Sequence, residues 1–314
     1  MKPDIIIFLK RIVLFMLLFI AADQALGFLL EHIYFNQEKG QFAQTTYSVD
    51  RTHEDILVFG SSRAVRHYSP AILSKAFNMS CYNVGRDAQM IPYYTAIQDV
   101  IFNRYKPKMI LLDVNSWELA PGESKYEKLS ILLPYCREHP ELVKYINQSS
   151  KWEKIKMLSR TYPYNSSLFI LGYNYLFANR IPADDHGYAP LIGEMTDAML
   201  EDHKRRMASG EEAKNDNSRD IDEKSLAYYE QFLAKTASSG IKTYVIISPK
   251  ILNENLNYRV EKLIEIAGRF KNVKFINFSN DPRYNYRYEK FADVFHLNKQ
   301  GAEEFTNDLI PLLK

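Results

Sequence analysis

The chain has few cysteines and almost no excess of charge. Only Cys81 and Cys136 occur among 314 residues, too few for a disulfide scaffold, a structural zinc site or a metal cluster. Forty basic and 38 acidic side chains leave a formal net charge of +2, which argues against nucleic acid as the main partner. With 46% hydrophobic residues and ordinary glycine and proline content, the composition excludes disordered and collagen-like chains. It predicts a globular protein with a sizeable core.

Long apolar runs are confined to the N-terminus. Residues 12–22 are continuously apolar, and residues 25–30 extend the run. A helix over residues 12–30 would rise about 28 Å, close to the hydrocarbon thickness of a bilayer. A carboxylate at Asp23 would cost about 2.5–3.5 kcal/mol in the bilayer unless it reaches the interface or a partner, which leaves a cleaved signal peptide as the alternative. No small-x-small cleavage site follows, so we predict an uncleaved anchor over residues 1–31.

Charges on either side of this run predict its orientation. Basic residues (Lys2, Lys10 and Arg11) precede the run, and the acidic Asp23 and Glu31 follow its core. By the positive-inside rule, the N-terminus stays in the cytoplasm and the chain after about residue 31 lies outside. We therefore expect a single-pass membrane protein with a linker over residues 32–53 and a folded extracytoplasmic domain over 54–314.

Short apolar runs alternate with helical stretches from residue 54 onward. The predicted strands cover residues 56–59, 81–84, 109–114, 243–247 and 273–277. The predicted helices begin near residue 70, cover about 87–105, 222–238 and 255–270, and resume at about 299. The alternation stops between about 118 and 222, which indicates a large insertion after the third strand, with a solvated polar loop at 208–220. Five parallel strands with crossover helices predict an α/β, flavodoxin-like three-layer sandwich with a parallel five-stranded sheet.

Polar residues follow the predicted strands, at the end of a parallel sheet where ligands bind. They are Ser61 and Ser62 after the first strand, Gly85 after the second, Asn115 after the third, and Asp293 and His296 before the last helix. A serine hydroxyl needs a base to become a nucleophile. His296 can accept its proton, and Asp293 can fix the tautomer of that imidazole. The placement predicts an acyl-transfer site, although each piece alone also occurs as an ordinary turn or helix cap.

This arrangement resembles the SGNH, or GDSL-like, hydrolase superfamily in its membrane-anchored extracytoplasmic form. The matching blocks are Gly60-Ser61-Ser62-Arg63, Asn83-Val84-Gly85, Asp113-Val114-Asn115 and Asp293-Val294-Phe295-His296. The resemblance covers about residues 54–118 and 222–314. It implies Ser62 as nucleophile, His296 as base and Asp293 as the residue that orients it. It also implies an oxyanion hole made by the backbone N–H groups of Ser62 and Gly85 and by the Asn115 side chain.

Two positions depart from the usual pattern of that superfamily. The first block lacks the Asp that often precedes the serine, and Ser116 stands where an Asp often follows the Asn of the third block. The second departure leaves open what orients Asn115. The chain also lacks the Gly-x-Ser-x-Gly elbow of α/β-hydrolases.

We therefore expect a serine esterase or O-acyltransferase that removes or transfers acyl groups, above all acetyl, on cell-surface polysaccharide. Its partners would be an acylated glycan or other ester substrate and the membrane. No cofactor and no metal are expected, because His186 has only Asp184 and Asp185 nearby in sequence. Tyrosine-bearing segments at 161–164 and 184–190 either stack on sugar rings or pack over a core. The alternative function is a non-catalytic glycan-binding or assembly protein of the same fold.

Overall fold

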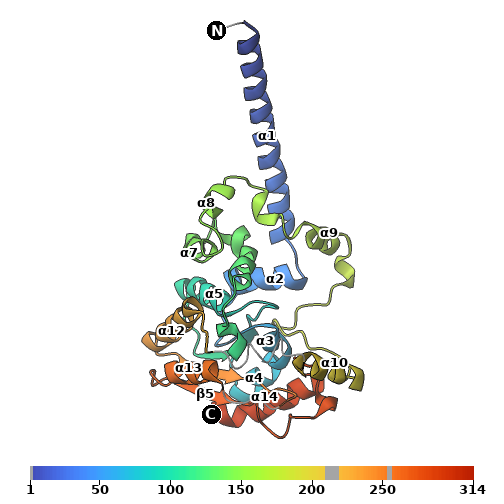
Figure 1. Cartoon of the computed structure of the whole chain (residues 1–314), viewed down its shortest axis with the longest axis vertical. Coiled ribbons are helices and arrows are strands. Elements are labelled where there is room, and N and C mark those ends of the chain that lie inside the picture. Colours follow the sequence, from blue (N-terminus) through green and yellow to red (C-terminus); the bar gives the residue numbers. More distant parts are fainter. Residues whose placement is uncertain (1–2, 209–218, 253–256) are drawn as a thin grey trace. The chain divides into compact units, whose positions relative to one another are not determined.

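The computed structural model of the chain describes residues 3–208, 219–252 and 257–314 (Figure 1). It divides into two compact units. The anchor unit contains residues 1–46 and 129–183, and the sheet unit contains residues 47–128 and 184–314.

A parallel five-stranded sheet forms the centre of the sheet unit. Its strands are β1 (Ile56–Phe59), β2 (Cys81–Asn83), β3 (Met109–Asp113), β4 (Lys242–Ile247) and β5 (Val273–Asn277). They lie in the order β2-β1-β3-β4-β5, and Val58 of β1 is opposite Asn83 on one side and Leu111 on the other. This is the flavodoxin-like order. The predicted strands are confirmed to within one residue at each end.

Helices cover both faces of this sheet because its strands are apolar on both sides. Ile56 and Val58 belong to the core cluster that contains Phe305 of α14 (Lys299–Leu313). Successive strand residues point to opposite faces, so Phe59 faces the other layer, where its ring packs 5.2 Å from that of Phe232 in α12 (Glu223–Ser238). The predicted three-layer sandwich is thus confirmed.

The remaining helices of the sheet unit extend these layers or connect them. They are η1 (Tyr47–Arg51), α3 (Ser62–His67), α4 (Pro70–Phe77), α5 (Ile91–Arg104), η2 (Ser116–Leu119), α6 (Ser124–Glu127), α10 (Asp197–Ala208), α13 (Tyr258–Ala267) and η7 (Tyr288–Lys290). Helix α3 was not expected from the sequence. Most of the predicted loop at 208–220, namely residues 209–218, lies outside the described residues.

The anchor unit is helical throughout most of its described length. It contains α1 (Pro3–Phe35), α2 (Gly40–Thr46), most of η3 (Lys128–Tyr135), η4 (Pro140–Leu142), α7 (Val143–Ile146), α8 (Glu153–Lys156), η5 (Tyr162–Tyr164), α9 (Leu168–Leu176) and η6 (Ala178–Arg180). Helix α1 is long and apolar enough to cross a membrane, and its apolar stretch is exposed.

The structure shows which elements the segments around the anchor contain and which compact unit they belong to. Residues 32–53, expected as a linker, contain the end of α1, all of α2 and the π-helical turn η1. Part of the expected insertion, residues 129–183, belongs with the N-terminal segment instead of extending the sheet unit. The physical reason is an aromatic cluster in which the buried Tyr34 ring lies 5.0 to 5.8 Å from those of Phe42, Tyr135 and Tyr164.

Asp23, the one acidic side chain within the apolar run, has partners in the same unit. Its Oδ1 accepts hydrogen bonds from the hydroxyls of Ser159 (2.7 Å) and Thr161 (2.6 Å), and its Oδ2 accepts one from the Arg160 N–H (2.8 Å). These hydrogen bonds offset the cost of removing the Asp23 carboxylate from water, which its place within the apolar run implies.

Candidate active site

The turn between β1 and α3 places a serine at the carboxyl end of the sheet. Gly60 has a φ of +149°, and a Cβ there would lie 2.8 Å from the Ala64 Cβ and 2.9 Å from the Asp113 carbonyl oxygen. Only glycine fits this close approach. The chain can therefore turn sharply after β1 and begin α3 at Ser62.

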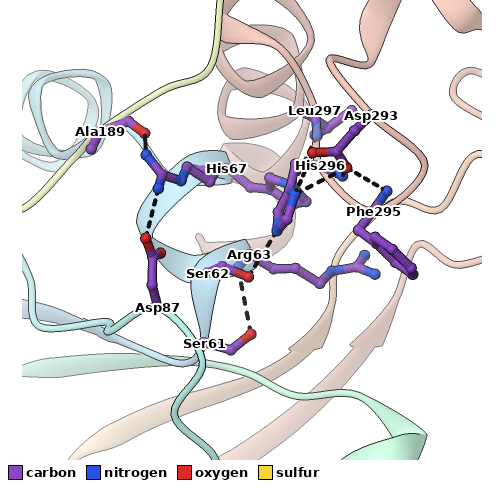
Figure 2. Close-up of polar contacts among 11 residues, drawn as sticks. Ser61, Ser62, Arg63, His67, Asp87, Ala189, Asp293, Phe295, His296 and Leu297 are labelled. Atoms are coloured by element: carbon purple, nitrogen blue, oxygen red, sulfur yellow. Dashed lines mark hydrogen bonds and ion pairs between the residues drawn. The ribbon is translucent and has the colours of Figure 1, made fainter. Parts of the chain in front are cut away.

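The two adjacent serines have different environments. Ser61 is buried, and its Oγ accepts a hydrogen bond from the Arg63 N–H at 3.4 Å, as the N-cap of α3. Ser62 is half-buried, and its Oγ lies 2.8 Å from Nε2 of His296 (Figure 2). The structure thus pairs Ser62, and not Ser61, with the imidazole.

His296 is held on its other side by Asp293. The imidazole Nδ1 lies 3.0 Å from Oδ1 and 2.9 Å from Oδ2 of Asp293. Oδ1 also accepts the backbone N–H groups of Phe295 (2.7 Å) and His296 (2.9 Å), which fixes the carboxylate within its own turn. Since a carboxylate only accepts, Nδ1 carries the proton and Nε2 presents its lone pair to the Ser62 hydroxyl. Figure 2 shows these side chains converging from α3 and from the loop before α14.

The charge state of Asp293 suits this arrangement. Partial burial raises the pKa of its carboxyl, but the hydrogen bond and the charge of His296, together with the two backbone N–H groups, outweigh burial and leave the pKa below its ordinary value. The group is therefore ionised at neutral pH and stabilises a positive charge on the imidazole.

A buried polar network contacts the backbone next to His296. The Leu297 N–H, directly after His296, donates to Nε2 of His67 at 3.0 Å. His67 Nδ1 lies 3.1 Å from Ser248 Oγ, which also accepts a hydrogen bond from Arg63 Nε at 2.9 Å. Burial, followed by the charge of Arg63, lowers the pKa of His67 well below its ordinary value. The ring is therefore neutral. Through these hydrogen bonds His67 connects α3 with Ser248 after β4 and with Leu297 in the loop before α14.

Asn115 occupies the end of β3, the strand next to β1. Its side chain is fully buried, and neither polar atom of its amide has a hydrogen-bond partner among the described residues. Its backbone is fixed by Glu118, whose Oε1 accepts the Asn115 N–H at 3.2 Å and whose own N–H donates to the Asn115 carbonyl at 3.1 Å. The sequence left open what orients Asn115, because Ser116 stands where an Asp often occurs. In the structure Glu118 fixes the Asn115 backbone.

The backbone N–H of Gly85 is engaged within the chain. It donates to Oδ1 of Asn83 at 3.0 Å, and Nδ2 of Asn83 donates in turn to the Ala64 carbonyl at 2.7 Å. A Cβ at Gly85 would lie 2.8 Å from the Ala64 Cβ, so β2 approaches α3 closely here. The loop that carries Gly85 therefore lies against the helix that begins at Ser62.

Two buried carboxyl groups, Asp113 and Glu118, lie on either side of Asn115 in the sequence. Burial raises the pKa of Asp113, although the Arg63 charge opposes it, and Tyr68 donates a hydrogen bond to Asp113 Oδ2 at 2.6 Å. Burial and the nearby Asp113 charge raise the pKa of Glu118 to about 8. Glu118 is therefore mostly protonated at neutral pH.

Two tyrosines of the segments at 161–164 and 184–190, for which the sequence left sugar stacking and core packing open, are packed in the interior. Tyr164 and Tyr188 are both buried, Tyr164 within the aromatic cluster of the anchor unit. Gly187, one residue before Tyr188, lies directly against the Asn83 backbone in the sheet unit. Among the residues that the structure describes, no cluster of three or more metal-ligating side chains occurs.

Sequence reasoning missed the supporting residues. Arg63 and His67 are four residues apart and so share one face of α3, but nothing in their spacing indicates contact with Ser248, which comes 185 and 181 residues later. Ser248 follows β4, so it occupies the same kind of strand-end position as the predicted site residues and was overlooked. Glu118 carries no sequence signal beyond its proximity to Asn115.

No protein-family model matches the sequence, and no curated protein matches it. Solved structures with similarity include a protein from Streptococcus pneumonia provisionally named a platelet activating factor, with 14% identity, a TM-score of 0.42 and coverage of 91% of this chain and 97% of that one. The acetyl xylan esterase AlAXEase has 13% identity, a TM-score of 0.39 and coverage of 82% and 100%. The acetyl xylan esterase Est2A from the rumen bacterium Butyrivibrio proteoclasticus has 9% identity, a TM-score of 0.38 and coverage of 82% and 63%.

Proposed function

We propose that this chain is a serine esterase or O-acyltransferase that works through an acyl-enzyme on Ser62. The observation that carries the proposal is the continuous hydrogen-bonded line from Ser62 Oγ to His296 Nε2 (2.8 Å) and from His296 Nδ1 to Asp293 Oδ2 (2.9 Å). These are the nucleophile, base and orienting carboxylate that acyl transfer requires.

In the first half-reaction, Ser62 Oγ bonds to the ester carbonyl carbon while its proton moves to Nε2 of His296. The bond from that carbon to the alcohol oxygen then breaks, and the proton passes from His296 to the leaving alcohol. In the second half-reaction, water or a sugar hydroxyl gives its proton to His296 and attacks the acyl carbon. Water yields the free acid and a sugar hydroxyl yields a new ester, and in both cases Ser62 regains its proton.

The negative oxygen of the tetrahedral intermediate needs donors. The Ser62 N–H is at the start of α3, where backbone N–H groups lack helical partners and favour negative charge. The Asn115 amide is buried and unpartnered among the described residues, and so is available to donate without first breaking another bond. The Gly85 N–H would contribute by sharing its hydrogen with Asn83 Oδ1.

The proposed substrate is an acyl ester, above all acetyl, on cell-surface polysaccharide. Helix α1 would hold the enzyme at the membrane with its sheet unit outside, where a fixed polymer is the reachable substrate. The exposed Phe295 ring lies next to His296, with ring centroids 6.3 Å apart, and offers an apolar face to the bound substrate.

Hydrolysis of an aryl acetate and release of acetate from acetylated glycan by the full-length protein would test this function. Ser62→Ala should lower activity by several orders of magnitude. Ser61→Ala is the matched control: it should lower stability by about 0.5–2 kcal/mol through loss of the cap and leave most activity. Equal activity of Ser62→Ala and the unaltered protein would exclude Ser62 as the nucleophile, and no hydrolysis by the folded, unaltered protein would favour the non-catalytic glycan-binding or assembly function.

The proposed topology has its own test. Protease added to sealed spheroplasts should digest the chain beyond residue 31, and the mature protein should retain residues 1–30. Full protection from protease would reverse the orientation. A mature N-terminus near Asp23 would show a cleaved signal peptide.

A further inference from the structure

The anchor unit exposes large apolar side chains outside α1. They lie in and around α8 and in α9, and we call them the apolar collar: Trp152, Ile155, Leu158, Phe169, Tyr175 and Leu176. Phe169 is 96% exposed, Leu158 77% and Leu176 73%. Water-soluble surfaces rarely concentrate such side chains unless another surface covers them.

The collar is fixed to the part of α1 where its apolar stretch gives way to polar residues. Ser159, next to Leu158, donates to Asp23. Arg160 forms an ion pair with Glu31 at 2.8 Å, and its guanidinium lies 3.3 Å from the ring centre of Phe28. These contacts hold residues 159–160, which follow α8, against α1, and Figure 1 shows the chain leading from α8 to α1.

The position along α1 matches the surface of a bilayer. Residues 12–30, which follow Lys10 and Arg11, rise about 28 Å, nearly the full hydrocarbon thickness. Phe28 would then lie near the outer edge of the hydrocarbon, and the carboxylate of Asp23, slightly further in, is compensated by its hydrogen bonds to Ser159, Arg160 and Thr161. Leu26, Phe28 and Leu29 remain exposed beyond Asp23, so the apolar surface of α1 continues at the level where Arg160 contacts Phe28.

Charge next to the collar fits lipid headgroups. Lys151 and Lys154 are exposed on either side of Trp152 and Glu153. Glu153 itself is buried and forms an ion pair with Lys156 at 2.7 Å. Basic side chains beside exposed aromatic and aliphatic ones are typical of segments that lie in the interface of a membrane with anionic lipids.

We propose that the apolar collar inserts into the headgroup region of the outer leaflet beside α1. The anchor unit would then contact the membrane through two features, the spanning helix α1 and the apolar collar at the interface. This inference rests on the proposed membrane span of α1.

The two tryptophans of the chain, Trp117 and Trp152, provide matched reporters. Trp117→Phe leaves Trp152 alone, in the collar. Trp152→Phe leaves Trp117 alone, at similar exposure in the sheet unit. Each full-length variant is reconstituted into vesicles of phosphatidylcholine and phosphatidylglycerol, with and without bromine on the acyl chains, and retention after an alkaline wash is recorded.

Brominated lipid should lower Trp152 emission at least about twofold, whereas Trp117 emission should change little. If the chain stays with the vesicles after the alkaline wash but Trp152 is not quenched, the insertion of the collar is refuted and the membrane span of α1 is not. If that chain also forms a concentration-dependent dimer, a second copy covers the surface instead. Release of the chain by the wash would overturn both the span and the collar.

The charge argument has a separate readout. Replacing Lys151 and Lys154 with Gln should weaken the dependence of Trp152 quenching on the phosphatidylglycerol fraction, because basic residues near the surface attract anionic headgroups. An unchanged dependence would show that anionic headgroups do not contact this segment.

Discussion

Replacing His67 with Phe tests whether the buried network positions His296, the proposed base. The substitution keeps an aromatic ring of similar size and removes both ring nitrogens. The buried Leu297 N–H then loses its acceptor at 3.0 Å, and Ser248 loses its contact at 3.1 Å. A buried polar group left unsatisfied costs about 1–3 kcal/mol, so the variant should be less stable by a few kcal/mol.

The effect on catalysis follows from the chain connection. Leu297 is bonded to His296, and any shift of its backbone moves the imidazole away from its 2.8 Å contact with Ser62. A misplacement of 1 Å in a catalytic group can lower the rate about 10²-fold. We expect kcat to fall roughly 10- to 100-fold with KM nearly unchanged, since both ring nitrogens of His67 have partners within the chain, Leu297 and Ser248.

Ester hydrolysis by the full-length protein, measured well below its Tm, separates positioning from stability. His67→Gln offers an acceptor and a donor at similar positions and should recover much of the rate. Leu309→Ala, in the buried face of α14, should cost about 2–5 kcal/mol of stability and leave kcat unaltered. An unaltered kcat in His67→Phe, or an equal loss in Leu309→Ala, would refute the positioning role.

Three further predictions concern the remaining groups of the site. Asn115→Ala should lower kcat about 10²–10³-fold with little change in KM, as measured by steady-state kinetics; a change in KM alone would make Asn115 a substrate-binding residue. His296→Gln should abolish the pH dependence that a general base gives to kcat/KM, and Asp293→Asn should lower activity steeply. A pH profile of kcat/KM that is unchanged in His296→Gln would exclude it as the base. For Glu118, the pKa is about 8 in the folded chain and about 4.5 when unfolded. The folded state therefore holds an extra proton between these values, so the unfolding free energy should fall as pH rises from about 5 to 8. Glu118→Gln should flatten that slope in chemical denaturation, and an unchanged slope would contradict the raised pKa.

The sheet could be predicted because its strands are short, apolar and bounded by turns. In β1, all four side chains from Ile56 to Phe59 are buried, and such a run has few interpretations other than a central parallel strand. The positions of Ser62 and Asn115 at strand ends followed from the same topology, since the carboxyl ends of adjacent parallel strands meet at one edge.

The network behind the site could not be predicted because its contacts join distant parts of the chain. His67 lies on a six-residue helix that is too short to give a periodic signal. Its partners, Ser248 and Leu297, come 181 and 230 residues later. Sequence patterns describe local structure, and only the packed fold brings such residues together.

The same limit explains why the sequence alone does not show how residues 32–53 pack. Residues 32–53 contain Tyr34, Phe42 and polar side chains without a long apolar run, a composition that fits a linker when read alone. Tyr135 and Tyr164 complete the aromatic cluster from about 100 residues away or more. Asp23 likewise lies within an apolar run in the sequence. Its carboxylate accepts hydrogen bonds from Ser159, Arg160 and Thr161, far along the chain.

Labelling with a fluorophosphonate, followed by peptide fragmentation in a mass spectrometer, tests the central claim most directly. The reagent phosphonylates a serine only when a base activates its hydroxyl. The account predicts one adduct per chain, on Ser62 and not on the adjacent Ser61, with labelling slowed by orders of magnitude in His296→Gln. An adduct on Ser61, labelling that is unaffected in His296→Gln, or a folded chain that takes no label would contradict it.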